Sequence, residues 1–295
     1  MKKLTSLLLA LVLVCALVGC GTDANQEDPA DGSSQTDTET SSNTEDGDNS
    51  EEDGSVEDES TPEDGSDEEE EPSADADVKS EGVMTYAEYD AAAVDTEVVI
   101  EAYVQGKQSW WDNKATVYTQ DADGAYFLYE MACSEEDYAK LVPGTKIKVT
   151  GYKSEWSGEV EIIDATFEIE EGSYIAEAED VTALLGSDDL VSHQNKFVSF
   201  KGMTVESQGQ DEDGNEIAFL YKWDGSGQDG DDLYFNVSLD GVTYTFTVES
   251  YLCDNTTDVY AAVKALNVGD KIDMEGFLYW YNGVNPHITS VTPAE

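Results

Sequence analysis

One stretch of the chain occurs twice, and this repetition constrains the fold more than any other feature. Residues 141–165, LVPGTKIKVTGYKSEWSGEVEIIDA, align without a gap with residues 266–290, LNVGDKIDMEGFLYWYNGVNPHITS. The matched residues are glycines of expected turns and apolar residues of an expected core, and they pair as Gly144 with Gly269, Lys146 with Lys271, Ile147 with Ile272, Gly151 with Gly276, Tyr152 with Phe277, Gly158 with Gly283 and Ile163 with Ile288. Internal self-similarity indicates repeated structural units. The chain from about residue 84 onward therefore contains two copies of one module.

Both copies show the same order of expected elements. In the first copy, a lead-in helix is followed by five alternating runs that are typical of strands, at 97–107, 114–121, 125–133, 145–153 and 159–169. A short helix separates the third run from the fourth. The helix is expected at 134–142. The second copy begins near Lys196, has its helix at 254–266, and carries a longer first connection from about 207 to 232.

Three strands, a helix and two strands is the element order of an OB-fold, a small Greek-key barrel. We therefore expect a mainly β protein with two tandem OB-fold-like five-stranded barrels, each with a short helix between strands three and four. The pair resembles tandem OB-fold domains of lipoproteins from Gram-positive bacteria. An immunoglobulin-like sandwich is the main alternative, and it gives no reason for the helix.

The N-terminus reads as an export signal. Residues 1–19 combine two lysines, an apolar run from Leu7 to Val18 and a small residue before Cys20. The run is shorter than the roughly 20 apolar residues of a membrane-spanning helix. Leu17-Val18-Gly19-Cys20 resembles the lipobox of bacterial lipoproteins, which implies cleavage before Cys20 and a lipid on its sulfur. A plain signal peptide with an incidental cysteine is the alternative.

Residues 20–82 form an acidic linker that separates this anchor from the modules. They are almost entirely Asp, Glu, Ser, Thr, Gly and Pro, without aromatic residues. Such a segment buries too little apolar surface to fold, so we expect it to be disordered. The expected domains are thus the signal at 1–19, the lipidated linker at 20–82, and the modules at 83–180 and 181–295.

The charge balance bears on the partner. The chain has 66 acidic residues against 14 lysines and no arginine, and its net charge is −52. Phosphate binding draws its affinity from basic residues, and a surface of this sign repels nucleic acid. On this ground we expect a neutral glycan or a protein as the ligand and disfavour nucleic acid.

Tryptophans mark a candidate ligand site. In OB-folds the binding face lies on strands two and three, between the loops that join strands one to two and four to five. This plan places Trp110 and Trp111 in one loop of the first module and Trp156 in the other. Trp280 and Tyr281 take the matching place in the second module. Exposed aromatic rings stack on bases, and we expect the same of sugar faces. The alternative is that these rings complete the barrel cores.

Two further groups of residues leave their roles open. The long connection of the second module holds carboxylates that are weak candidates for calcium, namely Asp224, Asp229, Asp231 and Asp232. Their spacing departs from the EF-hand pattern, which favours a solvated acidic loop, so no metal or cofactor is expected. Cys133 and Cys253 are the last residues of the third strands in the two copies. They are either small apolar residues of the cores or partners in a disulfide between the modules.

No catalytic motif is present, and we expect a protein that is not an enzyme. The sequence predicts a cell-surface lipoprotein, lipid-anchored on the outer side of the cytoplasmic membrane of a Gram-positive cell, whose modules bind an extracellular glycan or protein. A structural component of the envelope is one alternative. Single-stranded nucleic-acid binding by analogy with OB-folds is the other, disfavoured by the charge.

Overall fold

The computed structural model of the chain describes residues 79–294. The signal segment, the lipobox with Cys20 and nearly all of the acidic linker lie outside these residues. Among the helices at 79–294, none has the length and apolar character needed to cross a membrane.

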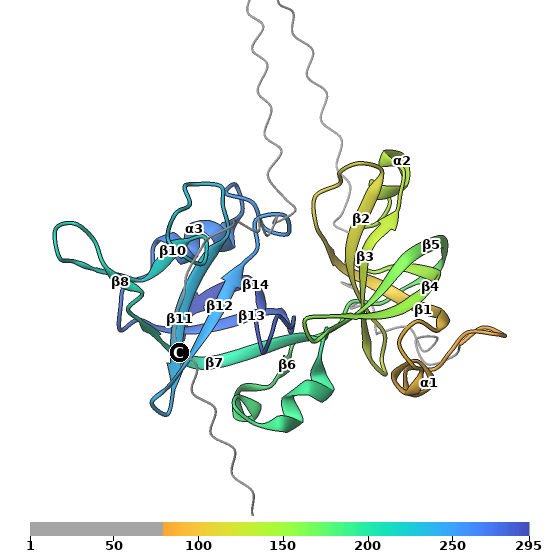
Figure 1. Cartoon of the computed structure of the whole chain (residues 1–295), viewed down its shortest axis with the longest axis horizontal. Helices are drawn as coiled ribbons and strands as arrows, with labels where there is room; N and C mark the ends of the chain where they lie inside the picture. Colours follow the sequence, from red (N-terminus) through yellow and green to blue (C-terminus); the bar gives the residue numbers. More distant parts are fainter. Residues whose placement is uncertain (1–78, 295) are drawn as a thin grey trace, which may run out of the picture. The chain divides into compact units, whose positions relative to one another are not determined.

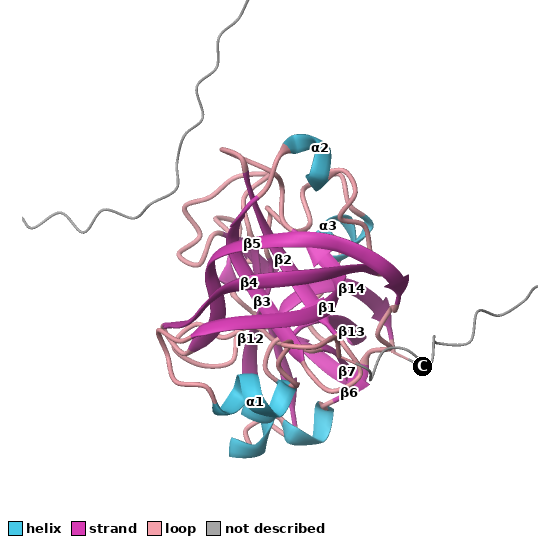
Figure 2. Ribbon diagram, turned by 90° about the vertical axis from the view of Figure 1, so that its right-hand side faces the viewer, coloured by secondary structure: helices cyan, strands magenta, loops and turns pink. Residues whose placement is uncertain are grey.

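The first module is a closed five-stranded barrel (Figure 1). Its strands close in the order β1-β2-β3-β5-β4, with β3 and β5 paired in parallel and all other neighbours antiparallel. The helices α1 and α2 lie at opposite ends of the barrel (Figure 2). The elements are α1 (Tyr86–Ala91), β1 (Glu97–Lys107), β2 (Lys114–Gln120), β3 (Ala125–Ala132), α2 (Glu135–Tyr138), β4 (Thr145–Trp156) and β5 (Glu159–Ser173).

The second module repeats this ring. The strands β7, β11, β12, β14 and β13 form it, and the pairing of β11 with β7 closes it. Short elements decorate it before β7 and in the long connection before β11. The elements are β6 (Glu179–Asp180), η1 (Thr182–Leu184), η2 (Asp188–His193), β7 (Phe197–Glu206), β8 (Gly209–Gln210), β9 (Glu216–Ile217), β10 (Phe219–Tyr221), β11 (Leu233–Leu239), β12 (Val242–Val248), α3 (Asp258–Lys264), β13 (Lys271–Phe277) and β14 (His287–Pro293). The predicted fold of two OB-fold-like barrels, with a helix after each third strand, is confirmed.

The repeated glycines have the same structural task in both barrels. Gly144 and Gly269 turn the chain into the fourth strand with φ of 90° and 92°, a backbone region that favours glycine. Gly151 and Gly276 lie where the fourth strand shifts register against the fifth. A Cβ there would approach Ile162 Cγ2 to 2.7 Å in the first barrel and a backbone oxygen to 2.2 Å in the second. The glycines recur in the sequence because both barrels need them at the same structural positions.

Each barrel has its own apolar core. The first is built on residues such as Ile100, Leu128 and Val149, and the second on residues such as Phe200, Phe235 and Met274. Each side chain is almost wholly removed from water, and burying a side chain of this size contributes about 1.5–3 kcal/mol.

A third apolar cluster joins the two barrels, which belong to one compact unit. Tyr118 on β2 and Phe127 on β3 pack against Phe277 of the second barrel, with Phe197, Leu252 and Tyr279 around them. The rings of Tyr118 and Phe277 stack with centroids 4.3 Å apart. The Tyr118 hydroxyl is hydrogen-bonded to Nδ1 of His287 at 2.7 Å. The outer face of strands two and three of the first barrel is thus covered by the second.

Candidate functional site

The equivalent face of the second barrel holds an open groove of about 350 Å³. Strands β11 and β12 form its floor, the 207–232 connection forms one wall, and the β13–β14 loop at 278–286 forms the other. It is lined by Gln208, Trp223, Tyr234, Asn236, Thr245, Tyr281, Val284 and Asn285. This is the position in which OB-folds bind their ligands.

Three aromatic rings line this groove. Trp223 is 74 % exposed and Tyr281 is 49 % exposed, so both offer a ring face to a ligand. Tyr234 is more enclosed, and burial raises the pKa of its hydroxyl to about 12. The Tyr281 ring also lies against Trp156 of the first barrel, with centroids 5.1 Å apart and planes inclined by 32°.

Amide and hydroxyl groups form the polar part of the groove. Asn236 Nδ2 donates to Gln208 Oε1 at 3.1 Å, and the Thr245 hydroxyl donates to Asn236 Oδ1 at 2.7 Å. The Thr247 hydroxyl donates to Asn285 Oδ1 at 2.9 Å. Because Gln208 and Asn285 use their oxygens in these bonds, their amide N–H groups are available as donors to a ligand.

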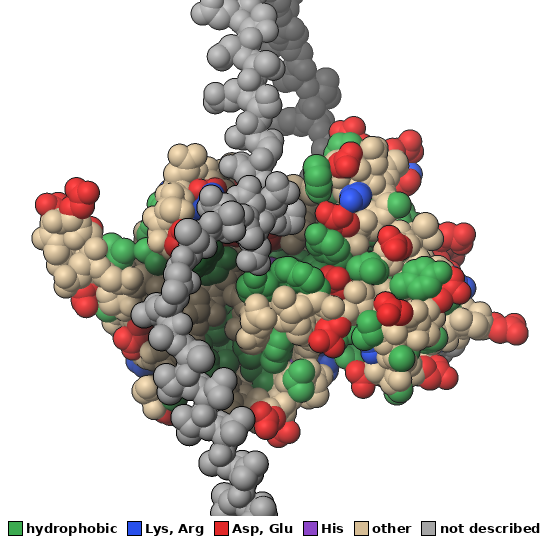
Figure 3. Space-filling model, viewed as in Figure 1, with side chains coloured by type: hydrophobic (Ala, Val, Ile, Leu, Met, Phe, Trp, Pro, Cys, Tyr) green, Lys and Arg blue, Asp and Glu red, His purple; other side chains and the backbone are tan. Residues whose placement is uncertain are grey.

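None of the eight lining side chains carries a charge. This is unusual in a chain with a net charge of −52. Figure 3 shows Asp and Glu spread over the visible face of the described residues, with few lysines among them. The groove is therefore a neutral aromatic and amide surface within acidic surroundings.

The carboxylates of the 207–232 connection hold this loop together. Asp232 Oδ1 accepts from the Ser250 backbone N–H at 2.8 Å, Asp231 Oδ2 accepts from the Gln228 N–H at 2.8 Å, and Asp224 Oδ1 accepts from the Ser226 N–H at 3.0 Å. Asp229 pairs with Lys264. Within the described part of the chain, no three Asp, Glu, His or Cys side chains are grouped as a metal site would require.

The tryptophans predicted from sequence are dispersed. Trp110 is half-buried and donates from Nε1 to the Cys133 carbonyl at 2.9 Å, whereas Trp111 is 62 % exposed. Trp156 pairs with Glu159 across the β4–β5 turn. This turn lies near the start of β3, whereas Trp110 and Trp111 lie near its end. The face between these loops is covered by the second barrel, and Trp156 is instead beside Tyr281. Trp280 is half-buried and packs against the second core.

Sequence reasoning did not identify Gln208, Asn236 and Asn285 as site residues. Isolated amides on strands and loops carry no pattern in a single sequence. Trp223 lies among the acidic residues of the 207–232 connection, where a single tryptophan forms no pattern either. The signal that identifies all four is the placement of strands two and three, which requires the fold.

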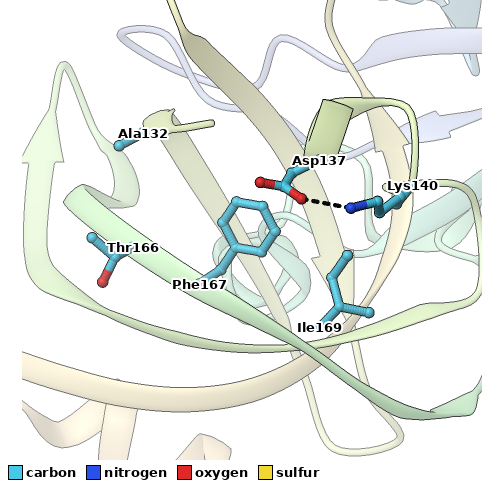
Figure 4. Close-up of a pocket in the computed structure, with 6 residues that line it drawn as sticks. All are labelled: Ala132, Asp137, Lys140, Thr166, Phe167 and Ile169. Carbon is cyan, nitrogen blue, oxygen red and sulfur yellow. Dashed lines mark hydrogen bonds and ion pairs between the residues drawn. The ribbon is translucent and has the colours of Figure 1, made fainter. Parts of the chain in front are cut away.

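The first barrel has a groove of its own, of about 450 Å³, between α2 and β5. Figure 4 shows Phe167 and Ile169 projecting from β5 on the side of α2, where Lys140 Nζ lies 2.9 Å from Asp137 Oδ1. Ala132 and Thr166 complete its lining. This groove has one aromatic ring and an internally satisfied ion pair, so it offers little to recognise a ligand.

Cys133 and Cys253 are free thiols buried in the two barrels. Burial raises the pKa of Cys133 to about 11 and that of Cys253 to about 12. Because the thiolate is the reactive form, both are inert core residues at neutral pH.

Comparisons with known proteins find similarity in the fold and none in the sequence. No protein-family model matches the chain, and no match is found among curated proteins. Among solved structures, it is similar to a murine DNA-binding protein bound to double-stranded DNA, at 11 % identity and a TM-score of 0.32, over 67 % of this chain and 96 % of that one. It is also similar to the HINa domain of Ifi202 in complex with 20-base-pair double-stranded DNA, at 10 % identity and a TM-score of 0.30, over 69 % and 98 % of the chains. A third is p202 HIN1 in complex with a 12-mer double-stranded DNA, at 11 % identity and a TM-score of 0.30, over 68 % and 91 %. At these values the likeness concerns the fold alone.

Two expectations from the sequence need correction. The sequence favoured a glycan or protein ligand outside the cell and disfavoured nucleic acid, on the ground of net charge. The solved structures named above are of proteins bound to double-stranded DNA, which runs against both expectations. The physical reason for the correction is that net charge describes the whole surface, whereas the lining of the groove is neutral, so the charge balance does not exclude nucleic acid from it.

Proposed function

We propose that the groove of the second barrel binds single-stranded nucleic acid, and that it does so through the bases. The observation that carries this proposal is the neutral lining of aromatic and amide side chains on the face formed by β11 and β12. Stacking of a base on an aromatic side chain contributes about 1–3 kcal/mol. Asn and Gln side chains hydrogen-bond to base edges, which lie open in a single strand.

The surrounding charge sets the mode of binding. Acidic side chains repel phosphates, so affinity has to come from stacking and base contacts. Salt screens repulsion between exposed charges. We therefore expect the affinity to stay constant or to rise from 50 to 200 mM salt, opposite to the steep fall for proteins that bind through phosphates.

The test is fluorescence anisotropy of a labelled 12-nucleotide single strand titrated with the full chain. Trp223→Ala and Tyr281→Ala should each weaken binding by about 5- to 100-fold, which corresponds to the loss of one stacked base. Trp111→Ala is the matched control, because it removes a tryptophan of the first barrel that is also mostly exposed. Absence of binding by the wild type, or equal losses in all three variants, would refute the proposal.

The lipid anchor belongs to this proposal as well. With a lipid on Cys20, the barrels would be held outside the cytoplasmic membrane and would meet nucleic acid there, in a binding role without catalysis. Metabolic labelling with an alkyne fatty acid tests the anchor, since Cys20→Ala should abolish the label.

A further inference from the structure

We propose that the first barrel completes the groove of the second, with Trp156 as an additional ring of the binding surface and Glu159 as a positioning residue for the loop that carries Tyr281. This inference rests on the proposed function. It extends the site across both barrels and assigns the first barrel a part in binding.

Trp156 lies where the groove ends. It is the last residue of β4 and is 52 % exposed, although its ring is in contact with Tyr281. Two exposed rings in contact form a continuous aromatic surface that leads out of the groove. A strand whose base stacks on Tyr281 would therefore bring the next base to Trp156.

The β4–β5 turn of the first barrel is bonded directly to the 278–286 loop of the second. Asn282 N–H donates to the Ser157 carbonyl at 2.7 Å. A Cβ on Gly158 would lie 3.1 Å from Trp280 Cδ1, so the two loops are packed without spare room. The backbone on both sides of Tyr281 is thereby held by the first barrel.

Glu159 is the centre of this connection. Its side chain is fully buried, and its Oε2 accepts from the Trp280 backbone N–H at 2.9 Å and from Gln194 Nε2 at 3.2 Å. Gln194 Nε2 also donates to the Gly158 carbonyl at 2.8 Å, and Asn195 Nδ2 donates to the Val160 carbonyl at 3.0 Å. One carboxyl group of the first barrel thus fixes the residue that precedes Tyr281.

The surroundings of Glu159 make this connection sensitive to pH. Glu161 on β5, Tyr279 on the 278–286 loop, Tyr118 on β2 and Tyr89 on α1 are the titratable groups that interact with it. Burial raises the pKa of Glu159 to about 8, and Glu161 adds to the rise. Its Oε1 is buried without a hydrogen-bond partner. Loss of the proton would leave a buried charge without a counter-ion, which is unfavourable.

The experiment compares Glu159→Ala, Glu159→Gln and Trp156→Ala in the full chain, with Glu155→Gln as control because that carboxylate is on the neighbouring strand β4 and is exposed. Two quantities are measured between pH 6 and pH 9: amide hydrogen exchange of residues 278–286 and affinity for the 12-nucleotide strand. We expect Glu159→Ala to accelerate exchange and weaken binding by about 10-fold each. Trp156→Ala should weaken binding about 5-fold at unchanged exchange. The affinity of the wild type should fall as pH rises through 8, and that of Glu159→Gln should not.

The outcomes separate this inference from the proposed function. Unchanged exchange in Glu159→Ala would overturn the positioning role. Faster exchange with full affinity in Glu159→Ala and Trp156→Ala would overturn the composite site while the groove itself stands. If the wild type binds no strand, the proposed function fails and Trp156 loses its role, whereas the exchange rates still decide whether Glu159 holds the loop.

Discussion

The two barrels share one fold and use the same face differently. In the first, strands two and three present Tyr118 and Phe127, which are buried against the second barrel. In the second, the equivalent strands present Asn236 and Thr245 to an open groove. The repeated glycines maintain the barrel, and the residues between them set the role of the face. The same face of the fold is thus a contact surface in one barrel and a candidate binding surface in the other.

The largest expected effect is on stability, and it comes from a substitution in the contact between the two barrels. Phe277 stacks on Tyr118 and is almost fully buried. Phe277→Ala should lower the free energy of unfolding by about 3–5 kcal/mol, measured by chemical denaturation. Trp223→Ala, on the open face, should change it by less than about 0.5 kcal/mol. A loss below about 1 kcal/mol for Phe277→Ala would contradict a tight interface.

A smaller effect on stability is expected from pH, through titratable groups at or near the contact between the barrels. Burial raises the pKa of Glu159 and of Glu249 to about 8, so the folded chain holds these protons more tightly than the unfolded one. The stability that they confer is present below about pH 4.5 and is lost as pH rises through 8. Burial lowers the pKa of His287 to about 3, so its contribution is lost as pH falls from about 6.5 towards 3.

The stability profile should therefore have a maximum near pH 4.5–5, with a loss of about 2–5 kcal/mol between pH 6 and pH 9. Denaturation at each pH measures it. Glu159→Gln should reduce the loss on the alkaline side, because of these two carboxyl groups only Glu249 then remains to cause it, and should leave the acid side unchanged. A wild-type profile that stays level up to pH 9 would show that these carboxyl groups are not buried as described.

The smallest effect concerns the open face. Lys222 is an exposed lysine that precedes Trp223. If it contacts one phosphate of a bound strand, Lys222→Ala should weaken binding less than about 3-fold and shift the slope of log affinity against log salt by about +0.7. Anisotropy titrations at four salt concentrations provide the slope. An unchanged slope would place the phosphates away from Lys222.

Much of the fold could be predicted from the sequence, and less of the site. Turn glycines such as Gly144 and alternating apolar runs follow from local geometry, and they predict the element order correctly. Which face remains open depends on contacts between residues far apart in sequence, such as Tyr118 with Phe277. Trp156 was expected to face the same cleft as Trp110 and Trp111, from the opposite loop. It lies instead beside Tyr281, because the second barrel occupies the face between these loops. A net charge of −52 describes the whole chain, so it could not predict that the side chains lining the groove are neutral.

The most direct test of the central claim is to observe the side-chain amides of Asn236 and Asn285 by two-dimensional NMR while an unlabelled 12-nucleotide single strand is added. Binding in the groove predicts that both NH₂ signals shift together and saturate, while the indole N–H signal of Trp111 stays in place. Signals that stay unchanged at millimolar strand, or shifts confined to the first barrel, would contradict it.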